Sequence, residues 1–106
     1  MNYNTITSHP RLKVILCHLP PPKDTSRVRR DNIPLAAGYL KAMAYKEGLL
    51  SQIDIEILDS IHNDLDGDAR LVDIIISKKP NILGFSLYPW NAVRSLFIAG
   101  EVREVL

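Results

Sequence analysis

Two short and almost uninterrupted apolar runs constrain the fold of this chain more than any other feature. They lie at residues 11–17 and 82–87, and Gly84 and Ser86 interrupt the second run. Runs of this length are typical of buried strands in a parallel sheet that is covered on both faces. Residues 53–58 differ, because isoleucines alternate there with two acidic residues, which is the pattern of a strand at the edge of a sheet.

The first helix is predicted at residues 35–47, which contain mostly good helix formers before a glycine ends the pattern. Asn32 is a candidate N-terminal cap. Small side chains at residues 36–38 would let this helix lie close to a sheet. We expect Leu40 and Met43, at helical spacing, to fill the remaining gap.

Two more helices are predicted at residues 68–78 and 90–105. The first has an apolar stripe made of Leu71, Ile74 and Ile75, and Pro80 forces the chain out of the helix. The apolar residues of the second share one face: Val93, Leu96, Phe97 and Gly100.

This order of elements predicts an α/β fold of the half-Rossmann, flavodoxin-like type, with three layers in a βαβαβα arrangement. Right-handed crossovers and the edge pattern of residues 53–58 place the parallel strands in the order 2-1-3. A doubly wound sheet of this type continues with two more strands, so we expect a sheet truncated before its last two strands, with an open third-strand edge. Residues 1–10 are expected to be a loose leader, and residues 11–106 an incomplete domain.

Composition excludes several classes of protein. A chain of 106 residues forms one domain, and a net charge of +1 gives no strong attraction for nucleic acid. No apolar run approaches the roughly 20 residues that cross a bilayer, and the first ten residues lack the pattern of a signal peptide. We therefore expect a cytoplasmic protein without a membrane or nucleic-acid partner. The single cysteine, Cys17, excludes an internal disulfide framework and any multi-cysteine metal site within the chain.

Familiar phosphate and metal motifs are absent or flawed. No Gly-x-Gly-x-x-Gly follows the first strand, and no Gly-x-x-x-x-Gly-Lys-Ser/Thr occurs. The chain therefore lacks the glycine-rich loops that bind phosphate in dinucleotide-binding and P-loop proteins. An imperfect calcium-loop pattern is formed by His62, Asp64, Asp66, Gly67 and Asp73. A solvated acidic loop, in which Asp66 or Asp68 caps the next helix, explains these residues better.

Two sets of residues near the first strand are candidate sites. Cys17 and His18 are adjacent, but successive strand residues point to opposite faces, so we expect a buried core cysteine and assign no catalytic residue. Four basic residues in the loop after this strand could meet a ligand phosphate or lie in solvent: Lys23, Arg27, Arg29 and Arg30.

The end of the third predicted strand is the best candidate for a ligand rim. In open α/β sheets, ligands bind beyond the carboxyl ends of the strands, where Ser86, Tyr88, Trp90 and Asn91 would lie. The alternative is that Tyr88 and Trp90 are ordinary core aromatics that seal this end of the sheet.

Two segments resemble one known family. Residues 34–43, Pro-Leu-Ala-Ala-Gly-Tyr-Leu-Lys-Ala-Met, resemble the first helix of the cobalamin (B12)-binding domain at the N-terminus of many radical S-adenosylmethionine enzymes. Residues 79–96, Lys-Pro-Asn-Ile-Leu-Gly-Phe-Ser-Leu-Tyr-Pro-Trp-Asn-Ala-Val-Arg-Ser-Leu, are similar to the third strand and helix of that family and are the more specific match. Residues 14–21 resemble its first strand with a Pro-Pro exit, a weaker signal.

The resemblance implies a corrinoid module in which the cobalamin's nucleotide tail lies against the sheet near the first and third strands. The matching positions here are Gly84, Ser86, Leu87, Tyr88, Trp90 and Asn91. The Asp-x-His-x-x-Gly motif, whose histidine ligates cobalt in other cobalamin domains, is missing, so we assign no metal ligand. The Cys-x-x-x-Cys-x-x-Cys motif is also missing, so S-adenosylmethionine and a 4Fe-4S cluster would belong to a separate radical domain, in cis or in trans.

Two alternatives remain open at this stage. The chain could be a non-enzymatic flavodoxin-like interaction module that pairs with another chain through its open sheet edge. It could also be a phosphate or nucleotide binder that uses the basic loop at residues 23–30.

Overall fold

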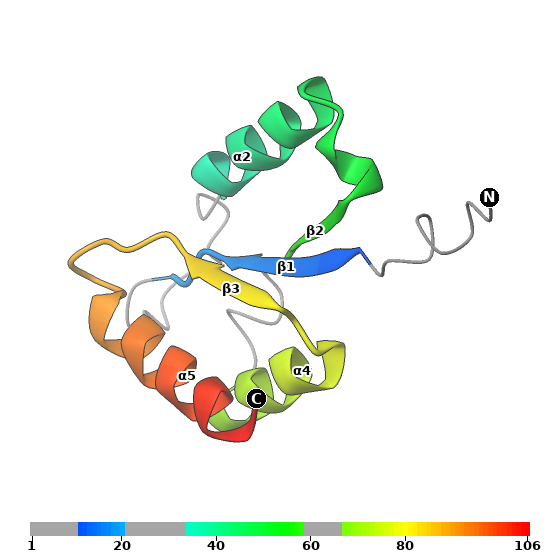
Figure 1. Cartoon of the computed structure of the whole chain (residues 1–106). Coiled ribbons are helices and arrows are strands. Elements are labelled where there is room, and N and C mark those ends of the chain that lie inside the picture. Colours follow the sequence, from blue (N-terminus) through cyan, green and yellow to red (C-terminus); the bar gives the residue numbers. More distant parts are fainter. Residues whose placement is uncertain (1–10, 21–33, 59–66) are drawn as a thin grey trace.

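A parallel three-stranded sheet forms the middle layer of the structure, a computed structural model that describes residues 11–20, 34–58 and 67–106 (Figure 1). Strand β1 (Leu12–Cys17) lies in the centre, between β2 (Ile53–Ile57) and β3 (Ile82–Phe85). Both pairings are parallel, and the strand order is β2-β1-β3. The predicted fold class and strand order are therefore confirmed.

Helices cover the two faces of this sheet unequally. Figure 1 shows α2 (Leu35–Lys46) on one face and both α4 (Asp68–Lys78) and α5 (Ala92–Val105) on the other. A short 3-10 helix, η1 (Leu49–Ser51), connects α2 to β2 and was not predicted. Gly48 ends the preceding helix in the left-handed conformation, at φ 72°, as a glycine at that position does best.

The core lies between the sheet and the α4–α5 layer. Because side chains alternate along β1, Ile15 and Cys17 point to this layer, whereas Val14 and Leu16 point to the other face. The buried residues of the core come from β1, its exit, the end of β2 and both helices: Ile15, Cys17, Leu19, Leu58, Leu71, Ile75, Ile98 and Val102. The expected stripe of α4 and the buried state of Cys17 are thus confirmed.

The expected packing of α2 was partly wrong. Ala37 and Ala44, seven residues apart on one face, are the buried residues of this helix. Leu40 and Met43, predicted to fill the gap, are more than half exposed. The buried face of α2 is thus made of alanines, and the two larger side chains lie on its exposed side.

Helix α5 begins and packs differently from the prediction. It starts at Ala92, after a turn that includes Pro89 and Trp90, and its buried residues are Ser95, Ile98 and Val102. The face that the sequence singled out points outward, with Val93, Leu96 and Phe97 all exposed. The outer face is thus at least as apolar as the inner one, which is why the pattern indicated the wrong side.

The start of α4 also differs from the prediction. Gly67 occupies the cap position and no side chain caps the helix. The carboxylate of Asp68 instead accepts a 2.6 Å hydrogen bond from Arg94 Nε of α5 and so links two helices. Several predicted features lie outside the described residues: the leader at 1–10, Asn32, the basic loop residues 23–30, and positions 62–66 of the imperfect calcium-loop pattern.

Within the described residues, no helix has both the length and the apolarity that a bilayer crossing requires.

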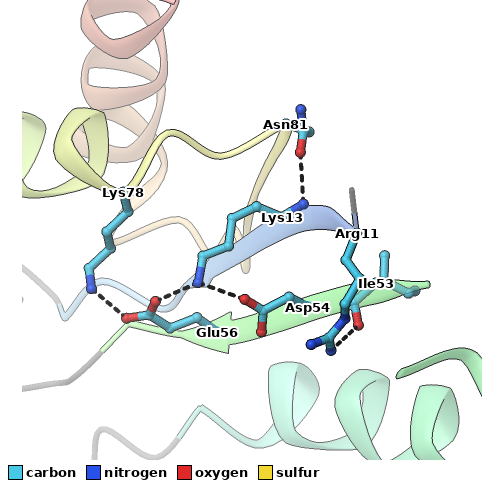
Figure 2. A network of polar contacts seen from close by, with 7 residues as sticks. All are labelled: Arg11, Lys13, Ile53, Asp54, Glu56, Lys78 and Asn81. Carbon is cyan, nitrogen blue, oxygen red and sulfur yellow. Dashed lines mark hydrogen bonds and ion pairs between the residues drawn. The ribbon is translucent and has the colours of Figure 1, made fainter. Parts of the chain in front are cut away.

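An ionic network closes the amino-terminal half of the sheet (Figure 2). Lys13 Nζ lies 3.2 Å from Asp54 Oδ2 and 2.9 Å from Glu56 Oε1 on the neighbouring strand, and Lys78 Nζ of α4 lies 2.7 Å from Glu56 Oε2. On the other side of β1, Asn81 Oδ1 accepts a 2.7 Å hydrogen bond from the Lys13 amide. Lys13 therefore links β1 to β2 through its side chain and to the residue before β3 through its amide, and Glu56 adds α4.

This network shifts the ionisation of its members. The ammonium groups of Lys78 and then of Lys13 hold the pKa of Glu56 below its ordinary value of 4.5, even though burial opposes the charged form. The contact with Glu56, followed by that with Asp54, raises the pKa of Lys13 above 10.5. A carboxylate with a lowered pKa stabilises the fold above its unfolded pKa, and this contribution is lost as the pH falls through the folded pKa.

We therefore expect Glu56→Gln to lower the free energy of unfolding by about 1 kcal/mol at neutral pH, since Lys78 loses this charged partner and Lys13 keeps only Asp54. The difference from the unaltered chain should disappear well below pH 4.5, where Glu56 itself becomes protonated. Urea denaturation at both pH values measures it. Glu101→Gln, at an exposed position of α5, is the control. An equal loss at both pH values would show that the charge of Glu56 is irrelevant to stability.

Candidate ligand-binding site

The carboxyl ends of β1 and β3 lie side by side and form one edge of the sheet. Leu16 pairs with Gly84 and Cys17 with Phe85, so the segments that leave the two strands start at the same level. The amide of Ser86 donates a 3.0 Å hydrogen bond to the carbonyl of Cys17, although β3 has already ended at Phe85. The predicted strand is thus two residues too long, because Ser86 and Leu87 belong to the exit segment.

Asn91 fixes the shape of this exit. Its side-chain Nδ2 donates to the carbonyls of Leu19, at 2.9 Å, and Ser86, at 3.0 Å. Its Oδ1 accepts a 2.8 Å hydrogen bond from the amide of Tyr88. The residue is only 1% exposed. Both donor hydrogens of the amide are used on backbone, so Asn91 positions the two exit segments and has no donor left for a ligand.

Three aromatic rings follow one another along this edge. Tyr88 and Trp90 are stacked, with ring centroids 4.7 Å apart and an angle of 2° between the planes. His18, at the end of β1, lies 5.4 Å from Tyr88 at a tilt of 39°. Trp90 is 49% exposed, so one part of the stack faces solvent. These residues form the aromatic rim, the name used below for His18, Tyr88 and Trp90.

Gly84 has a packing role in this structure. A β-carbon at this position would lie 2.9 Å from Cδ2 of Leu16. Glycine therefore makes room for the leucine side chain of the neighbouring strand. A ligand could use the space beside Gly84 only if Leu16 moved, so the expected opening in the strand is filled by the protein's own side chain.

The remaining predicted positions differ in accessibility. Leu87 is exposed, whereas Ser86 and Tyr88 are half-buried. Ser86, Leu87, Tyr88 and Trp90 thus all lie in the segment that leaves β3 at the carboxyl edge of the sheet. Gly84 and Asn91, by contrast, have structural roles in packing and in holding the exit segments. Such a rim offers an apolar flat surface and a hydroxyl, which suits the binding of a planar ligand.

Cys17, at the end of β1, is not suited to act as a nucleophile. Burial raises the pKa of the Cys17 thiol to about 12, and Cys17 is 1% exposed. A thiol in this state is neither a nucleophile nor a metal ligand at neutral pH. Among the described residues, no group of three or more His, Cys, Asp and Glu side chains is arranged to hold a metal ion.

His18 is the rim residue that sequence reasoning missed. The sequence indicated no role for His18 beside Cys17 or as a cobalt ligand, whereas the structure places it against Tyr88, 70 positions further along the chain. The predicted strand order was sufficient to place His18 beside the residues that follow the third strand. In a 2-1-3 sheet the first residues after β1 and β3 meet at the same edge.

No protein-family model, curated protein or solved structure matches this chain. Support for a function therefore comes from the side chains at this edge and from the resemblance of residues 79–96 described above.

We expect Asn91→Ala to lower the free energy of unfolding by about 3 kcal/mol, because it leaves three backbone groups of the two exit segments without partners. Asn81→Ala is the matched control. It removes one hydrogen bond at an exposed position and should cost less than about 1 kcal/mol. Urea denaturation followed by circular dichroism measures both. Equal losses would show that the Asn91 amide does not hold the two exits together.

Cys17 should resist thiol reagents as long as the chain is folded. We expect the rate of modification by a disulfide reagent at neutral pH to follow the fraction of unfolded chain, because the folded thiol is buried and protonated. The rate is measured by absorbance in rising urea. Rapid modification without urea, on a chain with a folded circular dichroism spectrum, would place Cys17 at an accessible site.

Proposed function

We propose that this chain is a cobalamin-binding module and that its aromatic rim contacts the nucleotide tail of the corrinoid. The stacked pair of Tyr88 and Trp90 is the observation that carries the proposal. It lies at the carboxyl edge of β1 and β3, where ligands of open α/β sheets bind, and within the segment that resembles the B12-binding domain.

The residues of the rim suit such a ligand in different ways. Half of Trp90 remains exposed after stacking on Tyr88, so a flat heterocycle can extend the stack. The hydroxyl of Ser86 can donate to or accept from a ring nitrogen, and Leu87 offers exposed apolar surface beside it. Asn91 acts indirectly, because its amide holds the exits of both strands in place.

The proposal extends to a partner domain. Cobalamin supplies radical or group-transfer chemistry when bound, and this chain would contribute binding and orientation only. The iron-sulfur cluster and S-adenosylmethionine would be held by a radical domain with the Cys-x-x-x-Cys-x-x-Cys motif, in cis or in trans. We place this activity in the cytoplasm, where a lone thiol such as Cys17 remains reduced.

Trp90 is the single tryptophan of the chain, so its fluorescence reports directly on the rim. We expect hydroxocobalamin to quench this fluorescence with saturation. Ser86→Ala should weaken binding by up to about tenfold, the equivalent of one lost hydrogen bond. Tyr45→Ala, which removes an exposed aromatic residue of α2, is the control and should bind as the unaltered chain does.

Cobinamide, a corrinoid without the nucleotide tail, separates tail recognition from non-specific binding. We expect it to bind at least about tenfold more weakly than hydroxocobalamin, because only the tail reaches the rim. Binding of Trp90→Ala is followed by visible absorbance of the corrinoid and should also be weaker. The proposal fails if folded chain shows no saturable change with hydroxocobalamin, or if the two corrinoids bind equally well.

A further inference from the structure

Leu16 and Gly84 lie next to each other on the two strands that lead to the proposed site. They are register partners in the pairing of β1 with β3, so the Leu16 side chain and the position of the missing Gly84 side chain share the α2 face of the sheet. A β-carbon on Gly84 would lie 2.9 Å from Leu16 Cδ2, whereas carbon atoms in contact lie about 3.5–4.0 Å apart. Leu16 therefore fills the space that the glycine leaves open.

The occupant of this space is the end of a flexible side chain. Apart from the chain neighbours of Gly84, no other atom of the described residues lies within 4 Å of that β-carbon position. Leu16 is half-buried, and Ile82, which precedes Gly84 on the same face, is 51% exposed. A leucine in a strand has more than one common χ1 rotamer. Leu16 can therefore turn away from Gly84 by a change of rotamer.

The aromatic rim continues along the α2 face. The amide of Ser86 donates to the carbonyl of Cys17 at 3.0 Å, which keeps the two exits in register for one residue beyond β3. By alternation, Ser86 then lies on the same face as Gly84, and His18 on the same face as Leu16. The opposite face at this level belongs to the core. A ligand that stacks on the rim and also reaches the sheet must therefore lie on the α2 face, next to Leu16.

We infer that Leu16 determines which corrinoids the proposed site selects, an inference that rests on the proposed function. The terminal heterocycle of the nucleotide tail lies over Gly84 and beside Ser86, and Leu16 must turn away before it can enter. No charged residue occurs from Pro80 to Val93, so the space suits an uncharged ring. A ligand that requires the turned-away rotamer binds with its intrinsic affinity multiplied by the fraction of chains in that rotamer. A corrinoid without the tail does not use this space, so Leu16 affects tailed corrinoids alone.

Titration of Leu16→Ala with hydroxocobalamin and with cobinamide tests the inference, with Trp90 fluorescence and the visible absorbance of the corrinoid as the two signals. We expect Leu16→Ala to bind hydroxocobalamin about fivefold more tightly than the unaltered chain, because the space is already open. Its affinity for cobinamide should stay the same. Leu12→Ala, the same change at the first residue of β1 and on the same face, is the control and should alter neither affinity.

A second substitution refills the opened space. Gly84→Ala in the Leu16→Ala chain places a methyl group there, so the affinity for hydroxocobalamin should return toward that of the unaltered chain. Leu16→Val replaces Leu16→Ala if that variant fails to fold by circular dichroism. Valine is shorter than leucine and suits a strand, so the same direction of change is expected.

The inference is overturned if the unaltered chain binds hydroxocobalamin and Leu16→Ala binds it equally well or more weakly. It is also overturned if cobinamide binding tightens by the same factor, or if Leu12→Ala has the same effect. These results leave the proposed function standing. Saturable binding of hydroxocobalamin by Leu16→Ala alone supports the inference, since Leu16 then keeps the site closed. If no folded chain binds hydroxocobalamin, the proposed function and the inference fail together.

Discussion

The buried amide of Asn91 is the interaction on which the carboxyl end of this structure depends. Its three hydrogen bonds reach the exits of β1 and β3 and the turn before α5. Buried amides are costly unless every polar atom is satisfied, and here backbone groups of separate segments satisfy them. The Asn91 side chain is hydrogen-bonded to the backbone at Ser86 and Tyr88. These bonds fix the segment that carries the stacked rings of Tyr88 and Trp90.

Different kinds of interaction stabilise the two ends of the sheet. At the amino end, charges hold the strands together through Lys13, Asp54 and Glu56, with Lys78 reaching in from α4 (Figure 2). At the carboxyl end, neutral hydrogen bonds and aromatic stacking replace charge. A rim built on aromatic stacking can accept a flat ligand on its exposed surface, whereas a ligand at the ionic end would have to displace the ion pairs of Lys13 and Lys78. The chemistry of the strand ends thus favours the carboxyl edge as the site of binding.

Much of this fold could be predicted from the sequence because the patterns were local. Continuous apolar runs, the alternation around Asp54 and Glu56, and Gly48 after a helical stretch each have one physical interpretation. The predictions that were wrong concerned which face of a helix is buried against the sheet. The outer side of α5 is as apolar as its inner side, so periodicity could not tell Phe97 from Ile98. At the site, position along the strands predicted Ser86, Tyr88 and Trp90 together, but only coordinates show that Asn91 is occupied by backbone and that Leu16 fills the space at Gly84.

Strand β3 and helix α5 both depart from the usual pattern of surface elements. A surface helix normally has one apolar stripe and one polar face, and an edge strand normally carries charge. Helix α5 instead exposes Val93, Leu96 and Phe97 and buries Ser95, and β3 carries no charged residue. The turn between them holds the stacked rings of Tyr88 and Trp90, and no charged residue occurs from Pro80 to Val93. Hydrophobic periodicity identifies the buried face of an element by its contrast with a polar face, and this segment offers little contrast. That is the physical reason why the inward face of α5 was predicted wrongly, whereas the alternating charges of β2 were interpreted correctly.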